Sequence, residues 1–119
     1  MNYELNYRNK KVYYNLYFLG NDLLLVIHGG DLSHIGGYST AYCFEDEWIT
    51  KSNALPHHKD EVLAQMYAEP IAKQLHCSVH CVCGVHYDDL GKDQLIEFID
   101  ENKKLLKEIL KDLEVQHGR

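Results

Sequence analysis

The residues most suited to chemistry are histidines, which gather with acids and a lysine at a few points along the chain. There are eight histidines among 119 residues. The densest group is PHHKDE at residues 56–61, where two histidines, a lysine and two acids follow a proline. Such a group could bind a metal, hold a phosphate, supply a catalytic pair or simply begin a helix.

The PHHKDE group stands where a helix is expected to start. The proline and the acids are ordinary helix-start residues, because acids in the first turn complement the helix dipole. The same dipole disfavours cations, so it does not explain His57, His58 and Lys59. Backbone donors combined with His and Lys suit a bound anion, above all a phosphate. A metal site that uses His58 and Asp60 stays open as an alternative.

A second group is GGDLSHIGG at residues 29–37, where two glycine pairs flank Asp31 and His34. Closely spaced glycines let backbone N–H groups converge on an anion. The spacing matches neither the dinucleotide-binding fingerprint nor a P-loop. Two interpretations stay open: a flexible connection between strands, or a ligand site that includes Gly36 and Gly37.

The third group, GVHYDD at residues 84–89, places His86 at the end of a predicted strand. Ligand sites gather where a sheet meets its loops, although a strand-terminal histidine can also be simply exposed to water. Together the three groups put His34, Lys59 and His86 at the ends of elements. This distribution predicts a polar, anion-accepting pocket at the rim of the sheet.

The cysteines have a simpler interpretation. Cys77, Cys81 and Cys83 would share one face of a strand over residues 77–86 with two valines, and free cysteine behaves as a small hydrophobe. No C-x-x-C pair of the kind that zinc sites use is present. We therefore expect these thiols to pack in the core.

The remaining elements follow from periodicity. Alternating apolar residues predict strands over residues 12–19, 23–28, 38–44 and 48–52, and a 3.6-residue period predicts helices over about 59–75 and 92–116. The order ββββ-α-β-α predicts an α+β domain spanning residues 1–119, with two helices on one side of a mostly antiparallel sheet. Pro70 predicts a kink or a helix in two pieces.

The composition narrows the function classes. A net charge of −6 argues against a surface for nucleic acid or anionic membranes. The start of the chain lacks a signal-peptide pattern, and the longest apolar run, LLLVI, is too short to span a bilayer. These features predict a cytoplasmic protein whose cysteines are thiols.

Three segments, taken in order, resemble the LpdD-like prenylated flavin chaperones, which are associated with UbiD-type aromatic-acid decarboxylases. They are DLLLVIHGGDLSHIGG, PHHKDEVLAQMYAEPIAKQL and VHCVCGVHYDDLGKDQLIEFI, from about residue 22 to residue 99. The resemblance implies a fold similar to small proteasome-assembly chaperones and a homodimer. It also implies a role in binding reduced prenylated FMN and loading a UbiD-type decarboxylase, with no catalysis by the chain itself. The flavin prenyltransferase is a possible further partner.

The resemblance does not assign ligand contacts, so the site residues are our own inference. We expect Lys59, His58 and the glycine loop to hold the phosphate, and His34 and His86 to approach the ring or a bound ion. The predicted cofactor-binding residues are His34, Gly36, Gly37, His58, Lys59, Asp60 and His86.

Two other functions stay open. One is a decarboxylase accessory subunit or assembly factor that acts through protein contacts without a ligand. The other is a small metal-dependent hydrolase or lyase that uses His34, His58, Asp60 and His86, although these residues have no fixed metal-ligand spacing.

Overall fold

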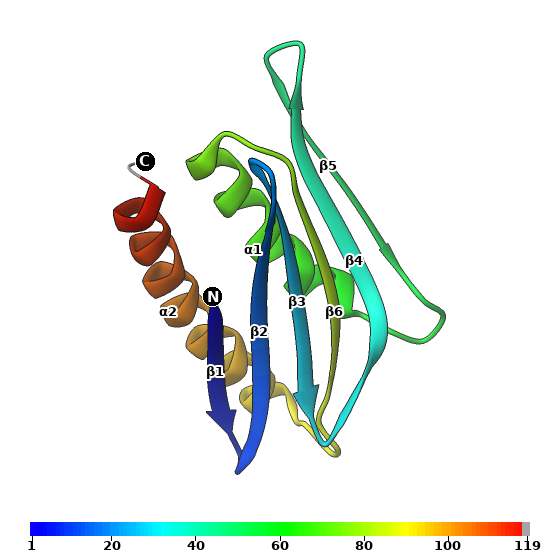
Figure 1. Cartoon of the computed structure of the whole chain (residues 1–119). Helices are drawn as coiled ribbons and strands as arrows, with labels where there is room; N and C mark the ends of the chain where they lie inside the picture. Colours follow the sequence, from blue (N-terminus) through cyan, green and yellow to red (C-terminus); the bar gives the residue numbers. More distant parts are fainter. Residues whose placement is uncertain (118–119) are drawn as a thin grey trace.

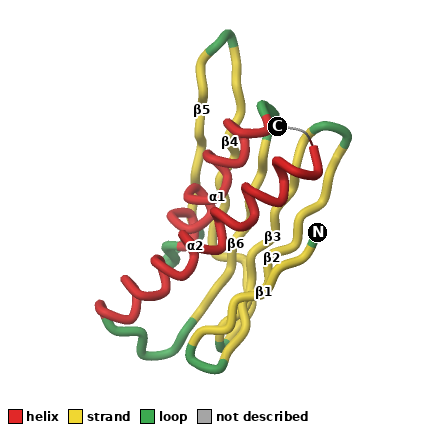
Figure 2. The backbone as a smooth tube through the Cα atoms, turned by 90° about the vertical axis from the view of Figure 1, so that its left-hand side faces the viewer, coloured by secondary structure: helices red, strands yellow, loops and turns green. Residues whose placement is uncertain are grey.

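A computed structural model describes residues 1–117, which form a six-stranded sheet with two helices on one face (Figures 1 and 2). The elements are β1 (Asn2–Tyr7), β2 (Lys10–Leu19), β3 (Asp22–Gly30), β4 (Leu32–Phe44), β5 (Glu47–Ala54), α1 (Asp60–Leu75), β6 (Val79–His86) and α2 (Lys92–His117). The predicted α+β class with a mostly antiparallel sheet is confirmed. Five strands precede α1, one more than expected.

The strand order is β1-β2-β3-β6-β4-β5, so β6 lies between β3 and β4. Only β3 and β6 run parallel, and the other neighbours are antiparallel. Consecutive strands β3 and β4 are therefore separated by a strand that comes after α1 in the sequence. This arrangement brings the end of β6 to the turn that joins β3 and β4.

The additional strand is β1 at the edge of the sheet. A two-residue turn at Arg8 and Asn9 joins it to β2, with φ of 53° and 61° at these residues. Positive φ at both central residues is the geometry of a tight hairpin turn. The hydroxyl of Tyr3 donates to Asp112 Oδ2 at 2.7 Å and that of Tyr7 donates to the Gln94 carbonyl at 3.0 Å, so β1 is tied to α2.

Residues 29–37 do not form the flexible connection that one of the two sequence-based interpretations gave them. β3 runs to Gly30 and β4 begins at Leu32, leaving a turn at Asp31, whose N–H donates to the carbonyl of His86 at 2.6 Å. Gly30 has φ of 79°, and a Cβ there would lie 2.2 Å from the His86 oxygen. The glycine is thus needed because the turn wraps closely around the end of β6.

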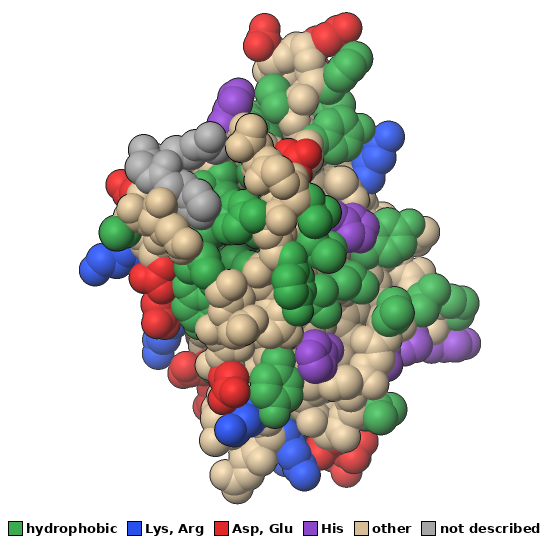
Figure 3. Space-filling view, in the orientation of Figure 1, with side chains coloured by type: hydrophobic (Ala, Val, Ile, Leu, Met, Phe, Trp, Pro, Cys, Tyr) green, Lys and Arg blue, Asp and Glu red, His purple; other side chains and the backbone are tan. Residues whose placement is uncertain are grey.

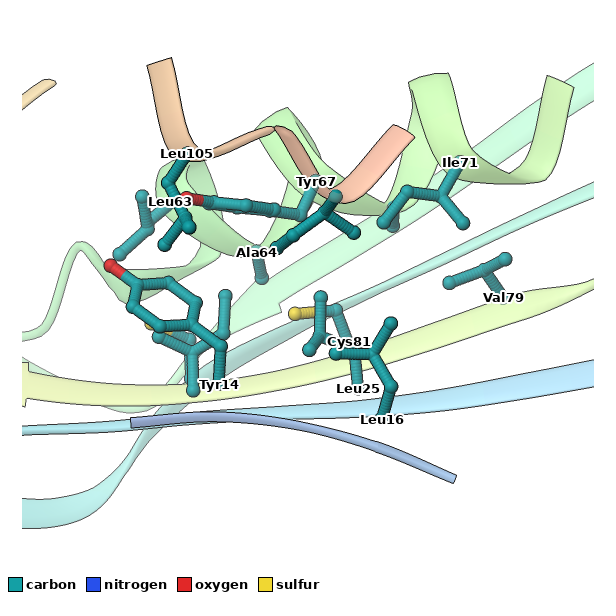
Figure 4. Close-up of a cluster of buried hydrophobic side chains, with 14 of the residues drawn as sticks. Tyr14, Leu16, Leu25, Leu63, Ala64, Tyr67, Ile71, Val79, Cys81 and Leu105 are labelled. Atoms are coloured by element: carbon teal, nitrogen blue, oxygen red, sulfur yellow. The ribbon is translucent and has the colours of Figure 1, made fainter. Parts of the chain in front are cut away.

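The helix layer packs on the sheet through an apolar core in which α1 supplies Leu63, Tyr67 and Ile71 (Figure 4). α1 runs through Pro70 as one helix, and not in two pieces. Cys81 and Cys83 are fully buried in this core, as predicted, whereas Cys77 precedes β6 and is half-buried. Within residues 1–117, no helix is long and apolar enough to cross a membrane.

A buried polar cluster holds α2 in place at the centre of this layer. The hydroxyls of Tyr14 and Tyr67 donate to Asn102 Oδ1 at 2.5 and 2.8 Å, and Asn102 Nδ2 donates to the Phe98 carbonyl at 2.9 Å. All three polar side chains are fully buried. We call Tyr14, Tyr67 and Asn102 the closed cluster.

Candidate functional site

A cavity of about 380 Å³ lies where the start of α1, the end of β6 and the first turns of α2 meet. Its polar lining residues are His34, His57, His58, Lys59, Asp60 and His86, and its apolar lining residues are Val62, Leu63, Val85, Tyr87, Leu90, Leu95, Phe98 and Ile99. Five of the seven predicted site residues therefore line one cavity. The three sequence groups that contain them meet because β6 inserts beside β4.

Asp60 is the structural centre of the site. It is the first residue of α1, and its side chain is only 10% exposed. Asp60 Oδ1 accepts the backbone N–H of Val85 at 3.0 Å, and Oδ2 lies 3.1 Å from His34 Nε2. This one carboxylate thus ties the helix to β6 and to the His34 side chain of β4.

Cys83 Sγ lies 3.8 Å from Asp60 Oδ1 and donates to the same carboxylate. Burial, together with the nearby Cys81 and Asp60, raises the pKa of Cys83 above its usual value. The thiol is therefore protonated and inert at neutral pH, because the thiolate is the reactive form. This supports a packing role for Cys83 beside the site.

The glycines near the site make room for these contacts. A Cβ on Gly36 would lie 1.8 Å from Asp60 Oδ2, and one on Gly37 would lie 2.6 Å from the Glu61 nitrogen. Neither glycine lines the cavity within the part of the chain that the structure describes. Their contact with a ligand stays a prediction, whereas their close approach to the start of α1 explains the glycine pair directly.

A bulge in β4 brings His34 to Asp60. Ser33 pairs with Val85 and Gly37 pairs with Cys83, so β4 carries extra residues between two closely spaced positions of β6. The backbone of His34 crosses Gly84, where a Cβ would lie 1.5 Å from the His34 oxygen. Bulges commonly re-aim side chains near functional sites, and here the bulge directs His34 to the start of α1.

The histidines are held in defined orientations. His58 Nδ1 lies 2.7 Å from the Pro56 carbonyl, which can only accept, so this nitrogen carries a proton and Nε2 is an acceptor in the neutral ring. The rings of His34 and His58 are in contact, with centroids 4.8 Å apart and planes tilted by 43°. His86 Nε2 lies 2.9 Å from Asp88 Oδ1 at the surface. We call His34, His58 and Asp60 the open cluster, since all three line the cavity.

Lys59 is the N-cap residue of α1, and its side chain is exposed. Among residues 1–117 it forms no ion pair with an acid, and α1 has no side-chain cap at this end. A free ammonium group at an uncapped helix N-terminus is well placed to neutralise an anion at the cavity.

A family model described as the prenylated flavin chaperone LpdD-like domain matches residues 6–114. The chain belongs to this family. The resemblance that the three motifs suggested is therefore confirmed over nearly the whole chain. A comparison with curated proteins found no match.

Among solved structures, this LpdD-like chain is similar to one described as "Crystal Structure of a Novel Chaperone Complex for Yeast 20S Proteasome Assembly". The TM-score is 0.59 at 13% sequence identity, and the alignment covers 97% of this chain and 94% of the other. At this identity the likeness concerns the fold. It confirms the expected similarity to a proteasome-assembly chaperone.

The apolar wall of this LpdD-like site was not predicted from the sequence. Leu95 and Ile96 belong to the helix predicted over residues 92–116; they are 49% and 54% exposed, and Leu95 lines the cavity. The signal was present in the spacing of Leu95 and Ile99, one helical turn apart at the start of α2. Their position opposite α1 could not be read from that spacing.

The metal alternative has no geometric support in the described residues. Among them, no group of three or more His, Cys, Asp or Glu side chains could hold a metal ion. Asp60 already accepts hydrogen bonds from Val85 and His34, and His86 turns to Asp88. A metal role for His34, His58, Asp60 and His86 remains only a sequence-based hypothesis.

Proposed function

We propose that the chain is a non-catalytic chaperone that binds reduced prenylated FMN in this cavity and assists its loading into a UbiD-type decarboxylase. The observation that carries the proposal is the composition of the cavity in a chain of this family. One side presents histidines and Lys59, and the other is apolar. Reduced prenylated FMN has a matching combination of an anionic phosphate and a large apolar ring system.

The polar side suits the phosphate. His57 and Lys59 are exposed and His58 is half-buried, so a phosphate at this side would keep contact with water. Asp60, the one carboxylate among the described lining residues, already accepts from Val85 and His34, which limits its repulsion of an anion. Ligand sites typically combine a mostly apolar lining with a few polar groups that fix orientation.

Anaerobic calorimetry with reduced prenylated FMN tests the proposal. We expect saturable binding to the wild-type chain, with loss of affinity in Lys59→Ala and His34→Ala, and slower maturation of an apo-decarboxylase by both variants. Normal activation of the decarboxylase by both variants, without any ligand binding, would instead favour an accessory subunit that acts through protein contacts.

We also propose that the chain is a cytoplasmic homodimer that pairs through the sheet face opposite the helices. Figure 3 shows hydrophobic side chains and histidines gathered on the middle of this face. Along the middle of the four central strands its outward residues are Tyr13, Asn15, Tyr17, Leu24, Val26, His28, Tyr38, Thr40, Tyr42, His80 and Val82, none of them Lys, Arg, Asp or Glu.

The charge distribution favours a second copy as the occupant of this face. The charged residues on this face lie at its margins: Lys11 and Asp22 stand at the starts of β2 and β3, Glu4 lies on β1 and Lys51 lies on β5. An apolar centre with a polar rim is typical of homodimer interfaces, and sheets pack face to face in sandwiches. Sedimentation of the wild-type chain should show a dimer. Val82→Glu should convert it to a monomer, whereas the control Lys51→Ala should leave the dimer intact. A monomeric wild type would contradict this proposal.

A further inference from the structure

The cavity has two chemically different walls. All of its titratable lining residues other than Tyr87 come from β4, from the end of β6 or from the start of α1 and the segment before it. The facing wall comes from α2 and the loop that leads into it, and the α2 residues that line it are Leu95, Phe98 and Ile99. No charged residue in the described part of α2 contributes to the cavity.

Tyr87 belongs to the apolar wall despite its hydroxyl. That hydroxyl donates to the Lys10 carbonyl at 3.1 Å, and the ring packs against Phe98 with centroids 5.4 Å apart. Burial, together with the charge of Asp31, raises the pKa of Tyr87 to about 12, so the phenol is neutral at physiological pH. Its polar atom is thus already bonded to the protein.

The apolar lining of the cavity is exposed in part, on both α1 and α2. Val62 on α1 is 61% exposed and Leu95 on α2 is 49% exposed, and both line the cavity. An apolar group that covered both side chains in the cavity would remove them from water, which is favourable in proportion to the area buried. The exposure of Leu95 also means that a polar substitution there would not disturb the core.

The size of the cavity restricts what enters it. At about 380 Å³ it is near the lower end of the roughly 300–1,000 Å³ that ligand pockets span. It suits a single ring system better than a complete nucleotide. The ring system is the apolar part of the ligand, and the ribityl phosphate would then extend along the side that carries Lys59 and His58.

Resting on the proposed function, we infer that Leu95, together with Ile99 and Phe98, recognises the prenyl-derived ring and distinguishes prenylated from unmodified FMN. The two ligands carry the same phosphate and differ by an added apolar ring. The polar side of the cavity therefore cannot separate them, and the discrimination falls to the wall that α2 supplies. The phosphate is left accessible for the protein that receives the cofactor.

Anaerobic titrations of the full chain with reduced prenylated FMN and with reduced FMN test this inference. We expect the wild type to bind the prenylated ligand at least about tenfold more tightly, since burial of a few additional carbons has this effect. Leu95→Ser should bring the ratio of the two affinities close to one by weakening only the prenylated ligand. Ile96→Ser is the matched control, because Ile96 is similarly exposed on the same turn but does not line the cavity.

The outcomes separate this inference from the function on which it rests. Equal affinity of the wild type for both ligands overturns the inference and leaves the proposed function standing. An equal loss for both ligands in Leu95→Ser also overturns it, since the side chain would then contact the shared flavin ring. Failure of the wild type to bind either ligand overturns the proposed function, and the inference with it.

Discussion

The closed and open clusters are two solutions to the same problem, the burial of polar side chains between α1 and its neighbours. In the closed cluster, Tyr14, Tyr67 and Asn102 form hydrogen bonds with one another and with the Phe98 carbonyl, at positions that are fully buried. In the open cluster, Asp60 and His34 are paired, but their side chains keep 10% and 20% exposure at the edge of a cavity.

The difference shows how one helix serves both stability and binding. The polar side chains of the closed cluster bond to one another, so they offer no free donor or acceptor to a ligand. Loss of these hydrogen bonds would leave buried polar groups unsatisfied. The open cluster uses one side of its carboxylate to fix α1 on β6, while its histidine rings stay beside the cavity. Four measurements would break or sharpen this contrast.

Alkaline pH should have the largest effect, because it acts on the core around the closed cluster. Burial raises the pKa of Tyr14, Tyr67, Cys81 and Cys83 above their ordinary values. The folded state therefore holds these protons more tightly than the unfolded state does, and it has their full stabilising contribution below about pH 8.5. Above that pH the free energy of unfolding should fall, by up to about 1.4 kcal/mol per pH unit for each group. Urea unfolding should show a loss on the order of 5 kcal/mol between pH 7.5 and 10.5.

Tyr14→Phe is the control for that experiment. It removes one of the titrating hydroxyls, so the fall in stability with pH should be shallower than in the wild type. An unchanged slope would mean that the buried tyrosines do not set the alkaline limit.

Asn102→Leu should have the next largest effect. It removes the side-chain oxygen that accepts from both Tyr14 and Tyr67, and only the Tyr67 hydroxyl keeps an acceptor, the backbone carbonyl at position 102. The free energy of unfolding should fall by about 3 kcal/mol. Ligand affinity of the folded protein should be unchanged, because Asn102 does not line the cavity. The neighbouring exposed Lys103→Ala should stay within about 0.5 kcal/mol of the wild type. A large change in ligand affinity would contradict the separation of the clusters.

Asp60→Ala should affect both properties. Loss of the acceptor for the Val85 N–H and for His34 should cost about 2 kcal/mol of stability and weaken binding of reduced prenylated FMN by about tenfold. Asp88→Ala removes a more exposed carboxylate beside His86 and should change stability by less than about 1 kcal/mol. Stability loss without any loss of affinity would place Asp60 with the closed cluster.

Lys59→Ala should have the smallest effect on stability, within about 0.5 kcal/mol, because the side chain is exposed and has no acidic partner in residues 1–117. Its effect should appear in binding, as a roughly tenfold weaker and less salt-dependent affinity for the ligand. Lys59→Arg keeps the charge and should retain most of the affinity. An affinity of Lys59→Ala equal to that of the wild type would remove Lys59 from the site.

Much of the fold could be predicted because it depends on local periodicity. Val12, Tyr14 and Leu16 alternate as a strand with one buried face, and the apolar stripe of α1 from Leu63 to Leu75 has the period of a helix. β1 was missed because its alternation of Tyr3, Leu5 and Tyr7 lies in a polar edge strand. The turn at Arg8 and Asn9 gave no glycine signal, although both residues adopt positive φ.

The candidate site was predicted in part for the same reason. His and Lys residues are disfavoured at the start of a helix, so their presence just before α1 needs another explanation. Lys59 and His58 could therefore be selected from the sequence alone. Leu95 could not, because an apolar residue on an amphipathic helix is equally compatible with a core position. Its exposure depends on where α2 begins relative to α1.

The sequence by itself determined the helices, most of the strands, the family and the residues at the start of α1, since each rests on patterns within a few turns of chain. Only the tertiary structure decided that β6 enters between β3 and β4, which brings His34, Asp60 and His86 to one cavity. It also decided that Gly36, Gly37 and Gly84 provide space for Asp60, the start of α1 and the β4 bulge. The physical reason is that such contacts join residues far apart in sequence, and their distances are set by strand order and packing.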